Sequence, residues 1–286
     1  MSFETLCYDQ LVFKASHNSY QRDEDLLNQL QWNPDKKYNC GCRSVELDIV
    51  RHSDSSGGAS ESYFQVNHEQ GATGPNLASY LGQLLSFHEQ KIMHDPIMVM
   101  LDIKSKEGSA EAFPNEIDTY LRTWFNADLI CTPGRVMWGA SGDLVAKIQE
   151  NGWPLLADLK GQFLFCLSGN EEWKSLYADC NTDERLCFAD FDVPVIPFMP
   201  VVPEVSGNRA IATLHLYSDQ YSWWAPIVAG LRAQRVIVRG WVINSEGLWD
   251  KAQGAGVNAL ATDKISNHEW AHVGSEPFAP SAPPAT

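Results

Sequence analysis

Residues 97–104 have the sequence IMVMLDIK, an apolar run that ends in one carboxylate and one ammonium group. A run this continuously apolar is typical of a strand that is covered on both faces, as in a parallel sheet. Asp102 and Lys104 are separated by one residue, so their side chains point to the same face of a strand. The run therefore predicts a buried strand that carries a polar pair at its C-terminal end.

Seven other short apolar runs recur along the chain, with helix-like segments such as 76–93, 115–127 and 141–153 between many of them. The third of these segments opens on a Ser or Asp start signal. Strands that alternate with helices predict a parallel sheet, and about eight strands in 286 residues favour an α/β fold, a closed (β/α)₈ TIM-type barrel, over an open doubly wound sheet. The other seven runs are 11–15, 42–50, 63–68, 162–168, 193–199, 235–243 and 258–265.

The barrel, regular or distorted, is expected to occupy residues 1–274 as a single domain. Residues 275–286 are dominated by Pro and Ala and predict a flexible tail. The Ser- and Gly-rich segment 51–62 predicts a flexible surface connection.

Composition excludes several classes of protein. The formal charge of −15 argues against nucleic-acid binding, because contacts to phosphates need clustered Lys and Arg. The chain has no long uninterrupted apolar stretch and no signal-peptide pattern, so we expect either a cytoplasmic protein or a trimmed secreted form. Seven cysteines without a C-x-x-C pair favour neither a zinc ribbon nor a thioredoxin-like site, and Cys180 and Cys187 are candidates for a disulfide in an oxidising compartment. The ten Trp residues are compatible with transient membrane-surface contact, although an ordinary packing role is the simpler interpretation.

Polar side chains end six of the eight runs, at the face where a parallel barrel carries its active site. A single His or a single E-x-D at a strand end is usually structural, but charges that recur inside apolar runs favour a functional site. The residues are His17 and Asn18, Glu46 and Asp48, His68, Asp102 and Lys104, Arg239 and Trp241, and Asp263.

Three of these side chains are carboxylates that would repel one another unless a cation lay between them. Glu46, Asp48 and Asp102, with the amide oxygen of Asn18, are hard oxygen ligands. Such a set favours Ca²⁺, with Mg²⁺ as an alternative. A zinc site of the amidohydrolase kind would need His-x-His on the first strand, which the chain lacks.

The order SHNSY, VELDI, a His after the third run, and MLDIKS resembles the catalytic barrel of calcium-dependent phosphoinositide-specific phospholipase C, most closely its single-domain bacterial and fungal branch. The topology matches over essentially the whole chain, and the specific motifs lie in residues 16–104. The sequence departs from the family at two positions. Asp102 stands where animal enzymes carry Glu, and Glu69 follows the second His where many relatives have Gly.

The resemblance implies an enzyme that cleaves phosphatidylinositol-type lipids by attack of the inositol 2-hydroxyl on phosphorus, giving diacylglycerol and a cyclic inositol phosphate. It implies that Asn18, Glu46, Asp48 and Asp102 hold Ca²⁺. His17 and His68 would flank the phosphate, and His17 or Glu46 would accept the proton. Lys104, Arg239 and Trp241 would contact the phosphate or the inositol ring.

Two alternatives remain open. The same barrel and metal would serve a glycerophosphodiesterase or a sphingomyelinase D-like phospholipase that acts on choline or ethanolamine head groups. A non-catalytic lipid-binding barrel is the third interpretation, but a pure binder has no need of a paired acid and base. The sequence does not address the oligomeric state.

Overall fold

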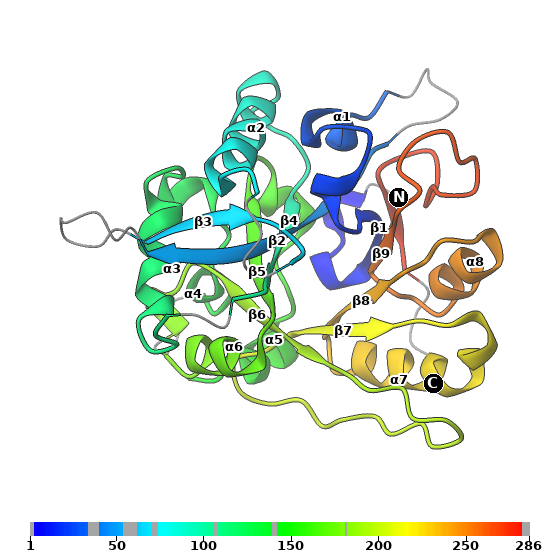
Figure 1. Cartoon of the computed structure of the whole chain (residues 1–286). Coiled ribbons are helices and arrows are strands. Elements are labelled where there is room, and N and C mark those ends of the chain that lie inside the picture. The colour runs from blue at the N-terminus through cyan, green and yellow to red at the C-terminus, as the bar shows by residue number, and fades with distance from the viewer. Residues whose placement is uncertain are drawn as a thin grey trace.

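The computed structural model describes residues 3–33, 40–53, 62–69, 74–105, 108–138, 142–180 and 182–281. Eight parallel strands form a closed barrel with helices around it (Figure 1), which confirms the predicted TIM-type barrel. The ring runs β1, β2, β4, β5, β6, β7, β8, β9 and closes through pairing of β9 with β1. Its strands are β1 (Leu11–Ser16), β2 (Ser44–Ser53), β4 (Ile97–Ile103), β5 (Phe163–Gly169), β6 (Phe188–Asp192), β7 (Ile211–His215), β8 (Ile237–Trp241) and β9 (Ala259–Thr262).

Two further strands lie outside the ring and are antiparallel. The run 63–68 is not a barrel strand: β3 (Ser62–Val66) pairs with the outer half of β2, which extends well beyond the ring. Part of the predicted tail is also ordered, because β10 (Phe278–Pro280) pairs with β1. Residues 282–286 of that tail and 54–61 of the predicted surface connection lie outside the described residues.

The fifth and sixth barrel strands, β6 and β7, differ from the prediction. The run 193–199 forms no strand, and the structure places β6 before it and β7 after it. Pro194 and Pro197 have no N–H to donate to a sheet ladder, so this run is unsuited to a central strand. The sequence of β6 does not indicate a buried strand, because it contains Asp190 and Asp192 and alternating charges are not expected in a covered sheet.

The three helix-like segments form helices, and two of them begin at a side-chain cap. The side chain of Asn76 accepts a hydrogen bond from the Ala78 N–H at the start of α2, and that of Asp143 accepts from the Val145 and Ala146 N–H groups at the start of α5. The helices are α1 (Leu26–Leu30), α2 (Leu77–Gln90), α3 (Phe113–Arg122), α4 (Pro133–Val136), α5 (Leu144–Asn151), α6 (Glu171–Ala178), α7 (Tyr221–Ala233) and α8 (Glu246–Gly254).

Side chains of the barrel strands alternate between two buried layers. On β4, Met98 and Met100 join one apolar core, whereas Val99 and Leu101 join the other. Asp102 continues the row of Met98 and Met100 toward the C-terminal end of the strand. The apolar row thus positions a carboxylate at the barrel mouth.

The described ranges contain all seven cysteines, and no disulfide joins any two of them. Cys166 is fully buried in β5, as its apolar run predicts. Cys180 and Cys187 are free thiols, so the candidate disulfide is not formed. No helix within the described ranges is long and apolar enough to cross a membrane.

Candidate active site

The C-terminal ends of β2 and β4 bring three carboxylates together. Glu46 and Asp48 share one face of β2, and Asp48 pairs in register with Asp102 on β4. One carboxylate oxygen from each of the three lies within 4.8 Å of the others. Asp48 is fully buried and Glu46 is nearly so. Three acidic groups this close and this dry repel one another strongly unless positive charge is supplied.

Two oxygens of this cluster are buried without a hydrogen-bond donor among the described residues. Asp48 Oδ1 and Asp102 Oδ1 are buried, and neither has a hydrogen-bond partner in the described part of the chain. Asp102 Oδ1 packs directly against Gly169 (φ +83°), and only glycine fits at that position because a Cβ there would lie 2.1 Å from Asp102 Oδ1. Buried polar atoms are rarely left unpaired without a reason. An all-oxygen donor set with two free oxygens fits a hard cation such as Ca²⁺ or Mg²⁺.

The electrostatics of Asp102 agree with this interpretation. Burial, with the nearby charges of Asp48 and Glu46, raises its pKa to about 6, although Lys104 acts in the opposite direction. Lys104 Nζ lies 3.0 Å from Asp102 Oδ2 and 3.5 Å from Asp48 Oδ2. With Arg239 on Glu46, two cationic side chains contact three carboxylates, so part of the negative charge of the cluster is not offset.

The second oxygen of Asp48 is shared by several donors. Asp48 Oδ2 accepts a hydrogen bond from the Tyr20 hydroxyl at 3.0 Å and lies 2.7 Å from His68 Nδ1. His68 follows β3, and its side chain is 55% exposed. The antiparallel pairing of β3 with β2 thus brings the titratable ring of His68 to Asp48. The other oxygen of the same carboxylate has no partner in the described part of the chain.

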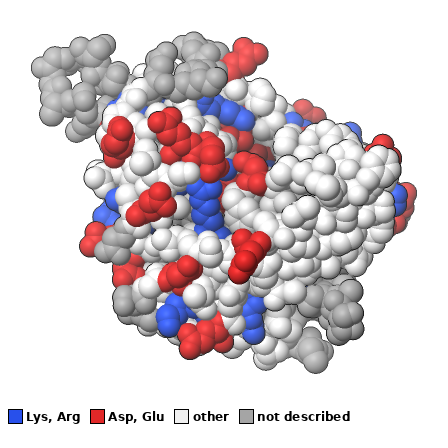
Figure 2. Space-filling view, turned by 90° about the horizontal axis from the view of Figure 1, so that it is seen from below, with Lys and Arg blue, Asp and Glu red and all other residues white. Residues whose placement is uncertain are grey.

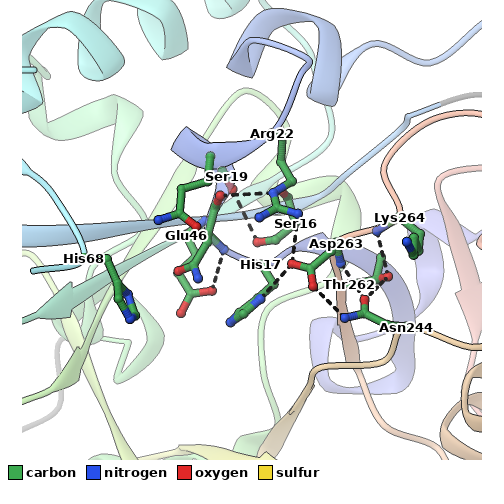
Figure 3. Close-up of polar contacts among 12 residues, drawn as sticks. Ser16, His17, Ser19, Arg22, Glu46, His68, Asn244, Thr262, Asp263 and Lys264 are labelled. Atoms are coloured by element: carbon green, nitrogen blue, oxygen red, sulfur yellow. Dashed lines mark hydrogen bonds and ion pairs between the residues drawn. The ribbon is translucent and has the colours of Figure 1, made fainter.

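His17, at the end of β1, is held by a different carboxylate. Its Nδ1 lies 2.9 Å from Asp263 Oδ1, and Arg22 and Asn244 also contact Asp263. Burial alone would raise the pKa of Asp263, but the hydrogen bonds from His17 and Asn244 and the charge of Arg22 hold it below its usual value. Figure 3 shows the His17 and His68 rings on the two sides of the Glu46 carboxylate.

Asn18 and Arg239 both approach Glu46. Asn18 has a left-handed backbone (φ 45°), which Asn tolerates better than most residues, and its N–H donates to Glu46 Oε2 at 3.1 Å. Arg239 NH2 donates to the same oxygen at 2.7 Å, and the Arg239 side chain is only 3% exposed. The structure therefore places Arg239 behind Glu46, within the barrel, instead of at the open mouth.

Trp241 ends β8 in an aromatic group that the sequence does not predict. Its ring stacks on His215 at 4.4 Å and lies 5.7 Å from the ring of His17. Tyr217 extends the group, with its hydroxyl 3.0 Å from His215 Nδ1. His215 and Tyr217 lie at and after the end of β7, a strand that the sequence analysis misses.

Several site residues lie in motifs that the sequence analysis quotes but does not assign. Tyr20 belongs to the SHNSY motif, and Asp263 ends the eighth run without a stated partner. Arg22 and Asn244 give no signal of their own, because neither ends an apolar run. Their contacts with Asp263 arise from loops that only the folded barrel brings together.

A family model and several solved structures are similar to this chain. The family model described as phosphoinositide phospholipase C, Ca²⁺-dependent, matches residues 64–194. The predicted resemblance is confirmed. The matched segment contains His68, Asp102 and Lys104, whereas His17 and Glu46 precede it.

Solved structures share the fold over nearly the whole chain. A calcium-dependent phosphoinositol-specific phospholipase C from a Gram-negative Pseudomonas species is 20% identical, with 97% of this chain and 96% of that chain covered and a TM-score of 0.73. A Ca²⁺-dependent phosphatidylinositol-specific phospholipase C from Streptomyces antibioticus is 16% identical, with 90% and 94% covered and a TM-score of 0.66. No curated protein matches the chain.

Proposed function

We propose that the chain is a calcium-dependent phosphodiesterase that cleaves phosphatidylinositol-type lipids to diacylglycerol and a cyclic inositol phosphate. The observation that carries the proposal is the pair of buried oxygens, Asp48 Oδ1 and Asp102 Oδ1, that lack a partner in the described part of the chain. Two histidines, each paired with a carboxylate, lie beside them. Similarity to the calcium-dependent phospholipase family supports the same conclusion. The similar Pseudomonas protein has also been solved as a myoinositol complex.

Glu46, Asp48 and Asp102 would hold the cation, with the carboxamide of Asn18 as the fourth predicted ligand and Mg²⁺ as an alternative occupant. A bound Ca²⁺ would act as a Lewis acid that acidifies the inositol 2-hydroxyl and offsets charge on the phosphoryl oxygens. Lys104, which already contacts two of these carboxylates, would neutralise part of the same charge.

We assign the general base to His17. Asp263 is an acceptor, so Nδ1 of His17 carries the proton that faces it and Nε2 keeps its lone pair. Nε2 would accept the proton of the inositol 2-hydroxyl as that oxygen bonds to phosphorus. Glu46 is the alternative base, but its Oε2 already accepts hydrogen bonds from Asn18 and Arg239, which makes it a weaker one.

We assign the general acid to His68. Its Nδ1 is oriented by Asp48, and its exposure leaves Nε2 open to a ligand at the mouth of the barrel. Nε2 would donate a proton to the glycerol oxygen as the bond between that oxygen and phosphorus breaks. Each of the two proton transfers is typically worth about 10²- to 10⁴-fold in rate.

Trp241 and Lys104 remain the proposed contacts for the head group, since both lie at the open end of the barrel. Arg239 is better assigned to Glu46, which it orients from inside the barrel. One observation favours the alternative of a choline lipid: Trp241, His215 and Tyr217 form an aromatic wall of the kind that attracts a quaternary ammonium group.

Phosphorus NMR of the full chain with phosphatidylinositol in mixed micelles tests the proposal and the alternative together. Parallel samples contain phosphatidylcholine, sphingomyelin or glycerophosphoinositol, each with calcium and then with excess chelator. We expect a calcium-dependent cyclic inositol phosphate from phosphatidylinositol. Turnover of a choline lipid without any inositol product would transfer the protein to the alternative, and no turnover of any substrate would favour a non-catalytic lipid-binding barrel.

A further inference from the structure

The connection from β6 to β7 has a proline at every third position. Residues 193–203, here called the proline strap, have the sequence VPVIPFMPVVP, with prolines at 194, 197, 200 and 203. Each proline ring fixes φ and lacks an N–H donor, which disfavours a regular helix or a sheet strand here. In place of the helix that usually follows a barrel strand, the chain has an irregular segment that turns at Pro197 and Phe198: Phe198 has a left-handed backbone (φ 61°), and the Met199 N–H donates to the Ile196 carbonyl at 3.2 Å.

The proline strap is apolar and exposed. Eleven large hydrophobic side chains are exposed in the described part of the chain. Five of the eleven lie between residues 196 and 202. Phe198 is 86% exposed, and residues 193–203 include no charged group. A concentration of exposed apolar groups of this kind marks an interaction surface, because isolated ones are the rule elsewhere on proteins. The five are Ile196, Phe198, Met199, Val201 and Val202.

The proline strap is fastened to α7 and does not hang free. Gln234, directly after α7, donates to the Pro203 carbonyl at 3.0 Å and accepts from the N–H of Val205, two residues beyond the strap, at 2.9 Å. Val202 packs on Gly230 so closely that a Cβ at that glycine would lie 2.4 Å from it. At the other end, the rings of Phe198 and Trp223 are 4.8 Å apart. The apolar groups are therefore presented by a fixed scaffold.

This surface adjoins the barrel mouth. Tyr217 and Tyr221, both exposed, lead into α7 from the end of β7, and Tyr217 contacts His215 in the aromatic wall of the site. In Figure 1 the yellow-green connection between β6 and β7 runs along the lower edge beside α7. Figure 2 views the molecule from that side, and much of its right half is a broad white surface, with Lys, Arg, Asp and Glu along its margins.

We propose that the proline strap, together with Trp223 at the start of α7, docks the protein onto a lipid bilayer surface and turns the barrel mouth toward the head groups. The proposal rests on the proposed function, because a lipid substrate must be reached in its bilayer. Apolar and aromatic groups without charge suit the boundary between head groups and acyl chains. A second copy is a poorer occupant, since two molecules of charge −15 repel each other at long range.

The same charge gives the docking an unusual salt dependence. Basic membrane anchors lose affinity as salt rises, because screening weakens their attraction to anionic lipids. Here the remainder of the chain is repelled by anionic lipid while the uncharged proline strap inserts. Binding to vesicles that contain phosphatidylinositol should therefore strengthen when salt is added.

Sedimentation with phosphatidylcholine vesicles that contain phosphatidylinositol, in calcium and at two salt concentrations, tests the proposal. The test variant is the double substitution Phe198→Ser and Met199→Ser. The matched control is Ile92→Ser and Met93→Ser, an adjacent pair that is 65% and 67% exposed and precedes β4 at the opposite end of the barrel. We expect the test variant to bind vesicles at least about tenfold more weakly and the control to bind like the wild type. Turnover of water-soluble glycerophosphoinositol, where the wild type shows it, should stay unchanged in both.

Equal weakening by both pairs, or by neither, would overturn the proposal. Light scattering that shows a wild-type dimer and a monomeric test variant, with no difference in vesicle binding, would assign the surface to a second copy instead. The sedimentation requires no turnover, so failure of the proposed function is seen separately. A chain that binds vesicles through the proline strap but cleaves no inositol lipid keeps the docking and refutes the reaction.

Discussion

Asp190 and Asp48 are both fully buried in the same barrel, yet their surroundings are opposite. The Oδ2 of Asp190 accepts hydrogen bonds from the Ser168 and Thr213 hydroxyls at 2.7 Å each, and its Oδ1 accepts from Lys174 Nζ at 2.7 Å. Asp48 has donors on Oδ2, whereas its Oδ1 has no partner in the described part of the chain.

The difference teaches how a buried carboxylate becomes structural or functional. Lys174 is fully buried on α6, and burial alone would lower its pKa, but the charges of Asp190 and Asp192 and their hydrogen bonds raise it above its usual value. The protein therefore supplies its own cation on that side of the barrel. Beside Asp48 and Asp102, the described part of the chain supplies the ammonium of Lys104, whose side chain is 26% exposed, and one such group for two carboxylates leaves charge for a metal ion to offset.

The largest effect should come from removing a histidine on the Asp48 side. We expect His17→Ala and His68→Ala each to lower turnover of phosphatidylinositol by about 10²- to 10⁴-fold, because each removes one proton transfer. Calcium binding and thermal unfolding should change little, since neither ring belongs to the proposed ligand set. Near wild-type turnover in either variant would remove that histidine from the acid-base pair.

On the Asp190 side the effect should be on folding. Lys174→Met leaves a buried carboxylate without its cation, and we expect it to cost about 3–5 kcal/mol in the free energy of unfolding, measured by urea titration. Added calcium should not restore the loss. The control is Lys104→Met, whose loss calcium should restore because a metal ion can take the place of that ammonium. If calcium rescued Lys174→Met as well, the contrast between the two sides would be wrong.

The same substitution at the two aspartates sharpens the contrast. Asp48→Asn should weaken calcium binding by about tenfold or more in isothermal titration calorimetry, because it removes one ligand charge. Asp190→Asn should leave calcium affinity unchanged and lower stability instead. A calcium titration that does not shift for Asp48→Asn would exclude this residue from the ligand set.

The smallest effect should appear in the pH dependence of metal binding. The raised pKa of Asp102, about 6, means that protons compete with the cation below that pH. Calcium affinity should fall by about tenfold for each pH unit below 6. Fold stability in the metal-free protein should change with pH in the opposite direction to calcium affinity. The raised pKa of Asp102 stabilises the fold below pH 3.8, and this contribution to the free energy of unfolding is lost as the pH rises through 6. An affinity that stays constant between pH 5 and pH 7 would contradict the competition.

The barrel and most of the carboxylate cluster were predictable, and the errors have a common cause. The cluster can be predicted from the E-x-D spacing on one strand and the Asp at the end of another, because side chains alternate between the two faces of a strand. The apolar content of the run 193–199 predicts a strand, but its prolines lack the N–H groups that a central strand needs. Conversely, Asp190 makes the sequence of β6 polar, and the sequence does not show that Lys174 forms a buried ion pair with this carboxylate.

The sequence by itself determined six of the eight barrel strands. It also determined that Glu46 and Asp48 face one side of their strand and that Asp102 ends another, because side-chain direction along a strand has a period of two. Only the tertiary structure decided which carboxylates found a partner. Lys174 with Asp190, Arg239 with Glu46 and Asp263 with His17 are pairs that strand register and loop closure create between distant residues. Asp48 Oδ1 and Asp102 Oδ1 have no such partner in the described part of the chain. The charge balance at the barrel mouth therefore depends on the tertiary structure.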